Sequence, residues 1–241
     1  EQYATFNISG PKTRNIIEKV FPEVNFSNEA FPFMTFQFHE YEDIPIRILR
    51  ASFTGEMGYE IYVPSNQALK IWEKIINFGK EFGLMPYGTE TMHLLRAEKG
   101  YIIVGQDTDG SITPLDLGLD WMIGKSKKDF LGKRSLIRSD TVRKDRKQLV
   151  GILPTNKNEK LEEGQHIILD KEIKTPTPML GHITSCYQSP TLGHNFALAV
   201  IKNGQSLIGT KAFASTPELK TIEVEIVEPI FYDKENTKLA S

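Results

Sequence analysis

The sequence predicts an α+β protein in two parts: a first part of strands and helices, and a second part that is a small antiparallel β-barrel or sandwich. Two observations predict this fold. In the first part, strand-like runs are followed by stretches of helical spacing, as two successive strand, strand, helix units. From Gln148 onward, short strand-like runs are separated by Pro and Gly, which is typical of small all-β domains.

The elements of the first part follow from local patterns. Gly10 ends the first strand-like run, and Pro11 stands where a helix can begin. Ser65 is a suitable N-cap for a long helix, in which Trp72 is expected to be a core residue, and Thr89 can cap the next helix. The expected elements are strands over 4–8, 33–38, 44–53 and 59–63, and helices over 12–20, from 65 to 79 or 83, and over 90–99.

The second part begins after a basic stretch. Between Lys125 and Lys147, ten Lys or Arg residues accompany three Asp residues in a polar stretch without strong periodicity. We place the domain boundary at its end, which divides the chain into residues 1–145 and 146–241. The expected strands of the second part span 148–153, 166–169, 180–187, 196–201, 211–214 and 221–227.

Composition narrows the class of protein. The 241 residues are 39% hydrophobic and 25% charged, as in ordinary globular chains. No apolar run approaches the roughly 18 residues of a membrane span and no leader is evident, so we expect a soluble chain without a membrane partner. The single Cys186 fits a reducing cytoplasm, and no residues have metal-ligand spacing. The net charge of −2 gives no reason to expect nucleic acid.

The segment RASFTGEMGYEIYVP, residues 50–64, is the most informative part of the chain. Gly55 and Gly58 allow a tight turn, and the alternation that follows is that of a strand with Glu60 and Tyr62 on one face. A carboxylate held there can accept two parallel hydrogen bonds from a ring N–H and an exocyclic amine, as in a pterin or guanine. The alternative is that Glu60 faces solvent, as most Glu residues do.

No other part of the sequence carries complete chemistry of its own. Asp107 and Asp109 can be an acid/base pair, but the chemistry of turns explains an Asp-Thr-Asp-Gly segment equally well. The five His residues are scattered, and the sequence has no nucleophile elbow, phosphate loop or dinucleotide fingerprint. The function is therefore expected to depend on a bound small molecule.

Several motifs along nearly the whole chain carry a resemblance to a known family. They are TGEMGYEI, LRAEKGYIIVGQDTDG, TPLDLGLDW, DFLGKRSL, RKQLVGILP, LEEG, GHITSCYQSPTLG and EPIFYD. Together they resemble the folate-binding aminomethyltransferase fold shared by the glycine-cleavage T-protein and several amine-oxidising enzymes, with the C-terminal folate region of sarcosine oxidase α subunits most similar. The resemblance implies an aminomethyltransferase-like folate-binding domain, truncated at its N-terminus, followed by a small antiparallel β-barrel.

The resemblance also implies a folate site. In the family, the carboxylate that matches Glu60 binds the pterin ring of tetrahydrofolate. The family has Tyr at the position of Phe53 and Arg at that of Met92, so Phe53 keeps a stacking surface without the hydroxyl and Met92 lacks a cation for the folate. Strand parity makes Tyr62 an aromatic wall, and Tyr232 lies where T-proteins place a folate contact.

The parent enzyme that the resemblance implies is an oxidoreductase with several cofactors. It demethylates sarcosine to glycine with oxygen as acceptor and passes the one-carbon unit to tetrahydrofolate, giving 5,10-methylenetetrahydrofolate. FAD, FMN and NAD are expected in the parent complex but not in this region, and the partners are the rest of the α subunit and the β, γ and δ subunits. The chain starts at Glu1 inside a fold, so we expect it to be a fragment, with the family's catalytic Asp upstream and no catalytic residue here.

Two other functions stay open. One is a stand-alone aminomethyltransferase of the glycine-cleavage type, which the residues at 53 and 92 disfavour. The other is a folate-binding or subunit-docking module without chemistry. The basic stretch can dock a partner subunit, steer folate polyglutamates, bind RNA or be a solvated linker.

Overall fold

The structure is a computed structural model that describes residues 2–173 and 175–239. These residues form two compact units. The first unit extends to Lys99 and resumes at Asp233, and the second unit extends from Gly100 to Tyr232. The predicted division of the chain between residues 145 and 146 stays a prediction.

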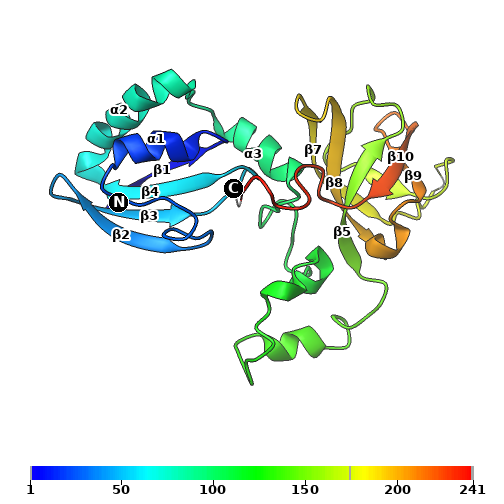
Figure 1. Ribbon diagram of the computed structural model, residues 1–241. Coiled ribbons are helices and arrows are strands. Elements are labelled where there is room, and N and C mark those ends of the chain that lie inside the picture. The colour runs from blue at the N-terminus through cyan, green and yellow to red at the C-terminus, as the bar shows by residue number, and fades with distance from the viewer. Residues whose placement is uncertain (1, 174, 240–241) are drawn as a thin grey trace. The chain divides into compact units, whose positions relative to one another are not determined.

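The first unit is a four-stranded antiparallel sheet with two helices on one face (Figure 1). The strand order is β1-β4-β3-β2, so β4 lies inside the sheet and β1 is an edge strand. The elements are β1 (Tyr3–Ser9), α1 (Thr13–Val20), β2 (Phe36–Tyr41), β3 (Ile44–Arg50), β4 (Gly58–Pro64), η1 (Ser65–Gln67), α2 (Ala68–Gly79), η2 (Lys80–Phe82) and α3 (Thr89–Glu98).

Alternation along β4 decides which face of the sheet meets the helices. Tyr59, Ile61 and Val63 are fully buried, and they pack with the apolar sides of α1 and α2. Each buried aliphatic side chain of this kind stabilises the fold by about 1.5–3 kcal/mol. Glu60 and Tyr62 alternate with them and lie half-buried on the opposite face. The predicted strand and its two faces are therefore present.

Two strand boundaries differ from the prediction. β2 begins at Phe36, three residues later than expected, because Met34 adopts a left-handed φ of 63° and the Thr35 amide donates to the Pro32 carbonyl in a turn. β3 ends at Arg50, where the chain turns toward the glycine-rich loop.

Three helix starts also differ. α1 begins at Thr13, so Pro11 lies in the preceding turn and is not the first helical residue. Ser65 is not at a cap position: it opens the short 3-10 helix η1 after Pro64, and α2 follows with Gln67 as its N-cap. Thr89 is the first residue of α3, and Gly88 takes the cap position.

The second unit contains a closed six-stranded antiparallel barrel, which confirms the predicted barrel. Its strand order is β10-β5-β8-β7-β6-β9, so each strand is paired on both sides. The elements are η3 (Pro114–Leu117), η4 (Asp120–Met122), η5 (Lys133–Ile137), β5 (Lys147–Pro154), β6 (His166–Ile168), β7 (Gly181–Ser189), β8 (His194–Lys202), η6 (Gly204–Leu207), β9 (Lys211–Ser215) and β10 (Thr221–Val227).

A buried ion pair joins η3 to the residue that precedes the first barrel strand, β5. The Arg146 guanidinium donates to the Asp116 carboxylate, with Nη2 2.6 Å from Oδ2 and Nε 2.8 Å from Oδ1. The amide and hydroxyl of Thr113 donate to the same carboxylate. Burial acts to raise the pKa of Asp116, but the hydrogen bonds from Arg146 and Thr113 outweigh it, so the pKa lies below its ordinary value.

The two aspartates of the Asp-Thr-Asp-Gly segment have structural partners. Asp107 is buried and accepts hydrogen bonds from the hydroxyls of Thr184 and Ser185, at 2.5 and 2.7 Å. Asp109 accepts from the amide and hydroxyl of Ser111, at 2.7 and 2.6 Å. These contacts are those of an anchored turn, which favours the structural alternative for this pair.

The C-terminal stretch belongs to the first unit. Lys99 Nζ lies 3.2 Å from Asp233 Oδ2, and the two side chains are only 2% and 3% exposed. Asp233 also accepts hydrogen bonds from the Thr237 hydroxyl and the Lys238 amide. A charged pair so well buried requires both partners, because removing one leaves an uncompensated charge.

No helix within residues 2–173 and 175–239 is both long and apolar enough to cross a membrane. In the same residues, no group of three or more His, Cys, Asp or Glu side chains is placed to hold a metal ion.

Candidate functional site

Glu60 lies in the middle of the sheet face that points away from the helices. Because β4 has a strand on each side, Glu60 is opposite Asn7 on β1 and opposite Leu49 on β3. Residues directly opposite on antiparallel strands have Cβ atoms about 4.5–5.5 Å apart. The carboxylate therefore has an amide on one side and an apolar side chain on the other.

Aromatic side chains share this face with Glu60. The Phe36 ring lies 5.0 Å from the Phe38 ring and 6.4 Å from the Tyr62 ring, measured between centroids. Phe36 and Phe38 are 44% and 71% exposed. The Arg47 guanidinium lies 4.3 Å from the centroid of the Tyr3 ring. The face therefore offers flat apolar surface that can stack against a planar ligand.

The Tyr62 hydroxyl donates a hydrogen bond to the Glu60 carboxylate. This hydrogen bond, together with burial and the negative charge of Glu60, raises the pKa of Tyr62 to about 12. An ionised carboxylate offers about four lone-pair sites. After the Tyr62 bond, Glu60 keeps acceptor capacity for a ligand with two parallel donors.

The loop before β4 fixes the position of Glu60. Gly55 has a left-handed φ of 83°, which few other residues adopt without strain. A Cβ atom at Gly58 would lie 2.6 Å from the Ala51 carbonyl oxygen. This position therefore requires glycine because the Ala51 backbone lies so close, and not because of its φ angle. Phe53 lies half-buried in the same loop.

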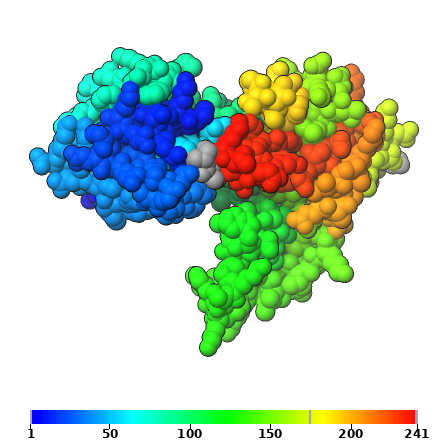
Figure 2. Space-filling model, viewed as in Figure 1, coloured from blue at the N-terminus to red at the C-terminus, as the bar shows by residue number. Residues whose placement is uncertain are grey.

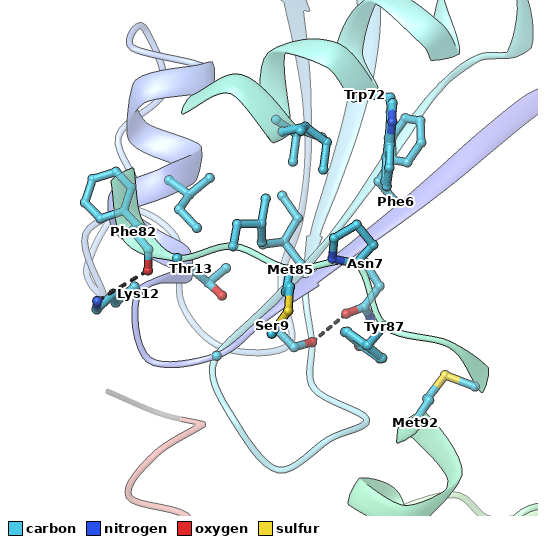
Figure 3. Close-up of a pocket in the computed structure, with 18 of the residues that line it drawn as sticks. Phe6, Asn7, Ser9, Lys12, Thr13, Trp72, Phe82, Met85, Tyr87 and Met92 are labelled. Atoms are coloured by element: carbon cyan, nitrogen blue, oxygen red, sulfur yellow. Dashed lines mark hydrogen bonds between the residues drawn. The ribbon is translucent and has the colours of Figure 1, made fainter. Parts of the chain in front are cut away.

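A cavity of about 550 Å³ runs along the outer edge of β1 (Figure 3). Residues of β1 form one wall, and the other walls come from the turn before α1 and the start of α1, from α2 and the segment after it, and from the start of α3. Figure 3 shows the Ser9 hydroxyl directed to the Asn7 side chain, to which it donates a hydrogen bond of 2.5 Å. Lys12 donates to the Phe82 carbonyl at 3.3 Å across another part of the wall. The cavity thus combines an apolar lining with a few polar groups, as small-molecule sites do.

Trp72 lines this cavity, which corrects the expectation that it is a core residue. Its side chain is 39% exposed, and its ring lies 5.9 Å from that of Phe6 on β1. The helical spacing placed Trp72 on the apolar side of α2. Its ring, however, packs beside Phe6 of the edge strand β1 and not over the centre of the sheet.

Asn7 connects the cavity with the Glu60 face. It lines the cavity from the edge strand, and it is the residue directly opposite Glu60 in the next strand. Sequence reasoning missed Asn7. The alternation of Thr5, Asn7 and Ser9 with apolar residues predicts one polar strand face, but only the pairing register places this face beside Glu60.

The structure brings only some of the predicted site residues together. Glu60 and Tyr62 share the open face, and Met92 lies in α3 at the cavity wall. Phe53 is in the loop before β4. Tyr232 belongs to the second unit, half-buried after the barrel. The assignment of all five residues to a folate stays a prediction.

Comparison with known proteins gives two family matches. Residues 1–127 match the family model described as GCVT N-terminal domain, and residues 147–233 match that of the glycine cleavage T-protein C-terminal barrel domain. The first match alone covers more than half of the chain.

Two kinds of curated relatives are similar to this chain. Sarcosine oxidase subunit alpha of Corynebacterium sp. (strain P-1) is 46% identical over 99% of this chain, and that of Rhizobium meliloti (strain 1021) is 34% identical over 99%. The chain spans about a quarter of the length of these relatives, 25% and 24%. Aminomethyltransferase of Halothermothrix orenii is 31% identical over 87% of this chain and 56% of its own length.

A solved structure has the same fold. The aminomethyltransferase T of the glycine cleavage system from Bartonella henselae aligns with a TM-score of 0.78 over 96% of this chain and 60% of that chain. At 22% sequence identity, this likeness shows the fold alone. It confirms the expected aminomethyltransferase fold with its C-terminal barrel.

Proposed function

Because the chain belongs to the glycine cleavage T-protein family, we propose that its first unit binds tetrahydrofolate and that the Glu60 carboxylate holds the pterin ring. The observation that carries the proposal is the place of Glu60. It is half-buried at the centre of an aromatic sheet face, with acceptor capacity left after its bond from Tyr62. A pterin presents a ring N–H and an exocyclic amine side by side, which a carboxylate accepts as a bidentate pair.

The cavity at the edge of β1 supports a place for the remainder of the folate. Asn7 stands between the Glu60 face and the cavity, and Phe6 and Trp72 offer rings at its wall. We assign the aminobenzoate ring to these aromatic side chains. Met92 lies at the same wall, so a glutamate tail that reaches it meets an uncharged thioether.

We further propose that the chain is the C-terminal folate-binding part of a sarcosine oxidase α subunit. The relatives with that name cover 99% of this chain and are 34–46% identical to it. When bound, tetrahydrofolate accepts the one-carbon unit from the oxidative demethylation of sarcosine and leaves as 5,10-methylenetetrahydrofolate, with glycine as the other product. In this proposal the residues of this chain bind and orient the acceptor.

The other parts of the proposed enzyme lie outside this chain. We assign FAD, FMN and NAD to the rest of the complex, together with the remaining α subunit and the β, γ and δ subunits. The single Cys186 is half-buried in the barrel and fits our assignment to a reducing cytoplasm.

A stand-alone aminomethyltransferase is the second candidate function. Relatives with that name are 30–32% identical to this chain. The lower identity favours the oxidase, as do Phe53 and Met92, which replace the Tyr and Arg that the T-protein pattern has there. A folate-binding module without chemistry remains the third candidate.

Calorimetric titration of tetrahydrofolate into the chain tests the folate site. We expect Glu60→Gln to weaken binding about 10- to 100-fold, because a hydrogen bond to a charged group contributes about 1.5–3 kcal/mol. Glu40→Gln is the matched control. Glu40 lies on β2, and its exposed carboxylate is on the same face of the sheet as Glu60. Equal affinities of the Glu60 variant and the wild type would overturn the assignment of Glu60. Failure of the wild-type chain to bind would overturn the folate proposal for this unit.

A further inference from the structure

Residues 121–142, here called the basic lobe, have no buried side chain. The segment nevertheless takes a defined path through η5 and several turns. The Lys133 amide donates to the Phe130 carbonyl, and the Thr141 hydroxyl donates to the carbonyls of Ser135 and Arg138, at 2.8 and 3.0 Å. In Figure 2 the lobe, drawn in green, stands out from the barrel. A stretch of this length without buried side chains gains little from the hydrophobic effect, which is the main force that orders a chain.

Large apolar side chains of the basic lobe point into solvent. Leu131 is fully exposed at 103%, Trp121 and Ile137 are each 72% exposed, and Met122 and Val142 are 62% and 59% exposed. Single exposed apolar residues are ordinary, but five within 22 residues are not. An excess of exposed apolar side chains is typical of interaction surfaces in soluble proteins.

Of the six cations of the basic lobe, Lys133 donates hydrogen bonds to the Lys127 and Lys128 carbonyls, and the other five form no ion pair within the described residues, whereas two arginines just after the lobe do. Arg143 pairs with Asp140 and Asp145, and Arg146 with Asp116 and Asp140. Within the described residues, no ion pair is formed by the cations of the lobe at positions 125, 127, 128, 134 and 138. The lobe holds six of the 29 Lys and Arg residues of the chain and two of its 31 Asp and Glu residues.

We propose that the basic lobe docks on an acidic patch of another subunit, with its exposed apolar side chains at the centre of the contact and its free cations at the rim. The five unpaired cations call for an acidic partner, and the exposed Trp, Met, Leu, Ile and Val side chains supply the apolar area that such a contact would bury. Protein interfaces have this arrangement of an apolar core and a polar, charged rim. The choice of a subunit as partner rests on the proposed function, because the relatives are named as the alpha subunit of an oxidase.

The side chains of the basic lobe favour a protein over a nucleic acid. Single-stranded nucleic acids are bound through several aromatic rings that stack on successive bases. Trp121 is the one aromatic residue among the five exposed apolar residues of the lobe, and the other four, at 122, 131, 137 and 142, are aliphatic or thioether side chains. The net charge of −2 also means that the remaining surface of this chain repels phosphates. A solvated linker does not require the exposed apolar groups at all.

Photochemical cross-linking within the assembled protein tests the proposal. Benzoylphenylalanine replaces Leu131 in the full-length protein, which is purified from cells that produce all of its subunits and then irradiated. We expect a cross-link to a different subunit, in a segment rich in Asp and Glu. The matched control is the same replacement of Leu219, another exposed Leu in the same unit, at 76% exposure, where we expect no such product. A cross-link only within the same chain, a cross-link to nucleic acid, or no cross-link would each overturn the proposal.

A charge-reversal variant provides the second arm. We expect the triple variant Lys125→Glu, Lys127→Glu, Lys128→Glu to reduce the yield of the cross-link and the affinity for the other subunits about tenfold or more. The triple variant with Arg at these positions keeps the charge and should retain both. The same preparations are titrated with tetrahydrofolate. If folate binds and the charge-reversed protein assembles normally, only the docking proposal fails; if folate does not bind but assembly depends on the lobe, only the folate proposal fails.

Discussion

The hydroxyl of Tyr62 donates to the carboxylate of Glu60, two residues earlier on the same strand face. Each residue therefore changes what the other can do. The carboxylate is held in place by a neighbour that the strand itself supplies. The phenol is kept protonated by the negative charge beside it.

The first prediction concerns the ionisation of Tyr62. Its pKa is raised to about 12, first by the hydrogen bond to Glu60 and then by burial. A raised pKa in the folded state stabilises the fold at pH values below the ordinary tyrosine pKa, about 10, and this stabilisation is lost as the pH rises through the raised value. We expect the tyrosinate absorbance of the wild type to contain a component with a midpoint near pH 12 that Tyr62→Phe removes. Glu60→Gln should move this midpoint down, and an unchanged midpoint would contradict the role of the carboxylate.

The second prediction concerns the residue that departs from the T-protein pattern at the cavity wall. Met92→Arg should tighten the binding of polyglutamylated folate by about two- to fivefold at low salt, since an exposed ion pair contributes up to about 1 kcal/mol. The gain should disappear at high salt, because salt screens exposed charges. Met92→Gln is the uncharged control, measured by the same titration. An equal gain from Gln would show that charge is not the cause.

The third prediction concerns the glycine that precedes Glu60. Gly58→Ala should destabilise the first unit by about 1–3 kcal/mol, because the new methyl group meets the Ala51 carbonyl oxygen at 2.6 Å and the backbone has to move. Urea unfolding measures the loss. Gly110→Ala is the control, since no atom lies within 4 Å of its added Cβ. A Gly58 variant as stable as the control would mean that the loop adapts without strain.

The fourth prediction separates two carboxylates that pair with the same arginine. Asp116 is 5% exposed and Asp140 is 64% exposed, and both contact Arg146. Asp116→Ala should destabilise the second unit by about 3–5 kcal/mol, because it removes the buried partner of Arg146 and leaves this cation with only the exposed Asp140 carboxylate. Asp140→Ala should cost at most about 1 kcal/mol, as an exposed pair does. Similar losses for the two variants would contradict this difference.

The same pair predicts a dependence on acid. The pKa of Asp116 is lowered because the hydrogen bonds from Arg146 and Thr113 outweigh the opposing effect of burial. A lowered pKa contributes stability above the ordinary Asp range, and this contribution is lost as the pH falls through the lowered value. Urea unfolding at a series of acidic pH values should therefore show a steeper loss of stability in the wild type than in Asp116→Ala.

The fifth prediction concerns the reactivity of Cys186. Burial raises the pKa of its thiol to about 11, and the thiol donates to the Leu161 carbonyl at 3.1 Å. Because the thiolate is the reactive form, alkylation of the folded chain by iodoacetamide near neutral pH should be far slower than that of the urea-unfolded chain. Mass spectrometry of the alkylated protein measures both rates. Equal rates would mean that the barrel opens readily around β7.

The sequence predicted the barrel strands well because of their local pattern. β8, for example, is a nearly continuous apolar run flanked by polar residues, and its neighbours are bounded by Pro or Gly. The start of β2 was predicted wrongly because a left-handed Met34 breaks a run of strand-forming residues, and no composition rule marks that backbone conformation. Trp72 was predicted wrongly because helical spacing gives the apolar side of α2 but not how far the sheet extends beneath it.

The candidate site was predictable to the same limited degree. Glu60 could be singled out because a carboxylate in an aromatic strand after two glycines is unusual by itself. Asn7 could not, because it resembles any polar residue on an exposed strand, and only the pairing register places it opposite Glu60. The division of the basic stretch into paired and unpaired cations could not be predicted either, since charge counts do not distinguish the paired Arg146 from the unpaired Lys127.

The pair of Lys99 and Asp233 has a consequence for the order of events during synthesis. The ribosome makes Lys99 before the barrel and Asp233 after it, so the nascent first unit waits for the entire second unit to be translated before its buried lysine has a counter-charge. Until then, the end of α3 must leave its ammonium group in water. The barrel, whose strands all come from one uninterrupted stretch of chain, can close first.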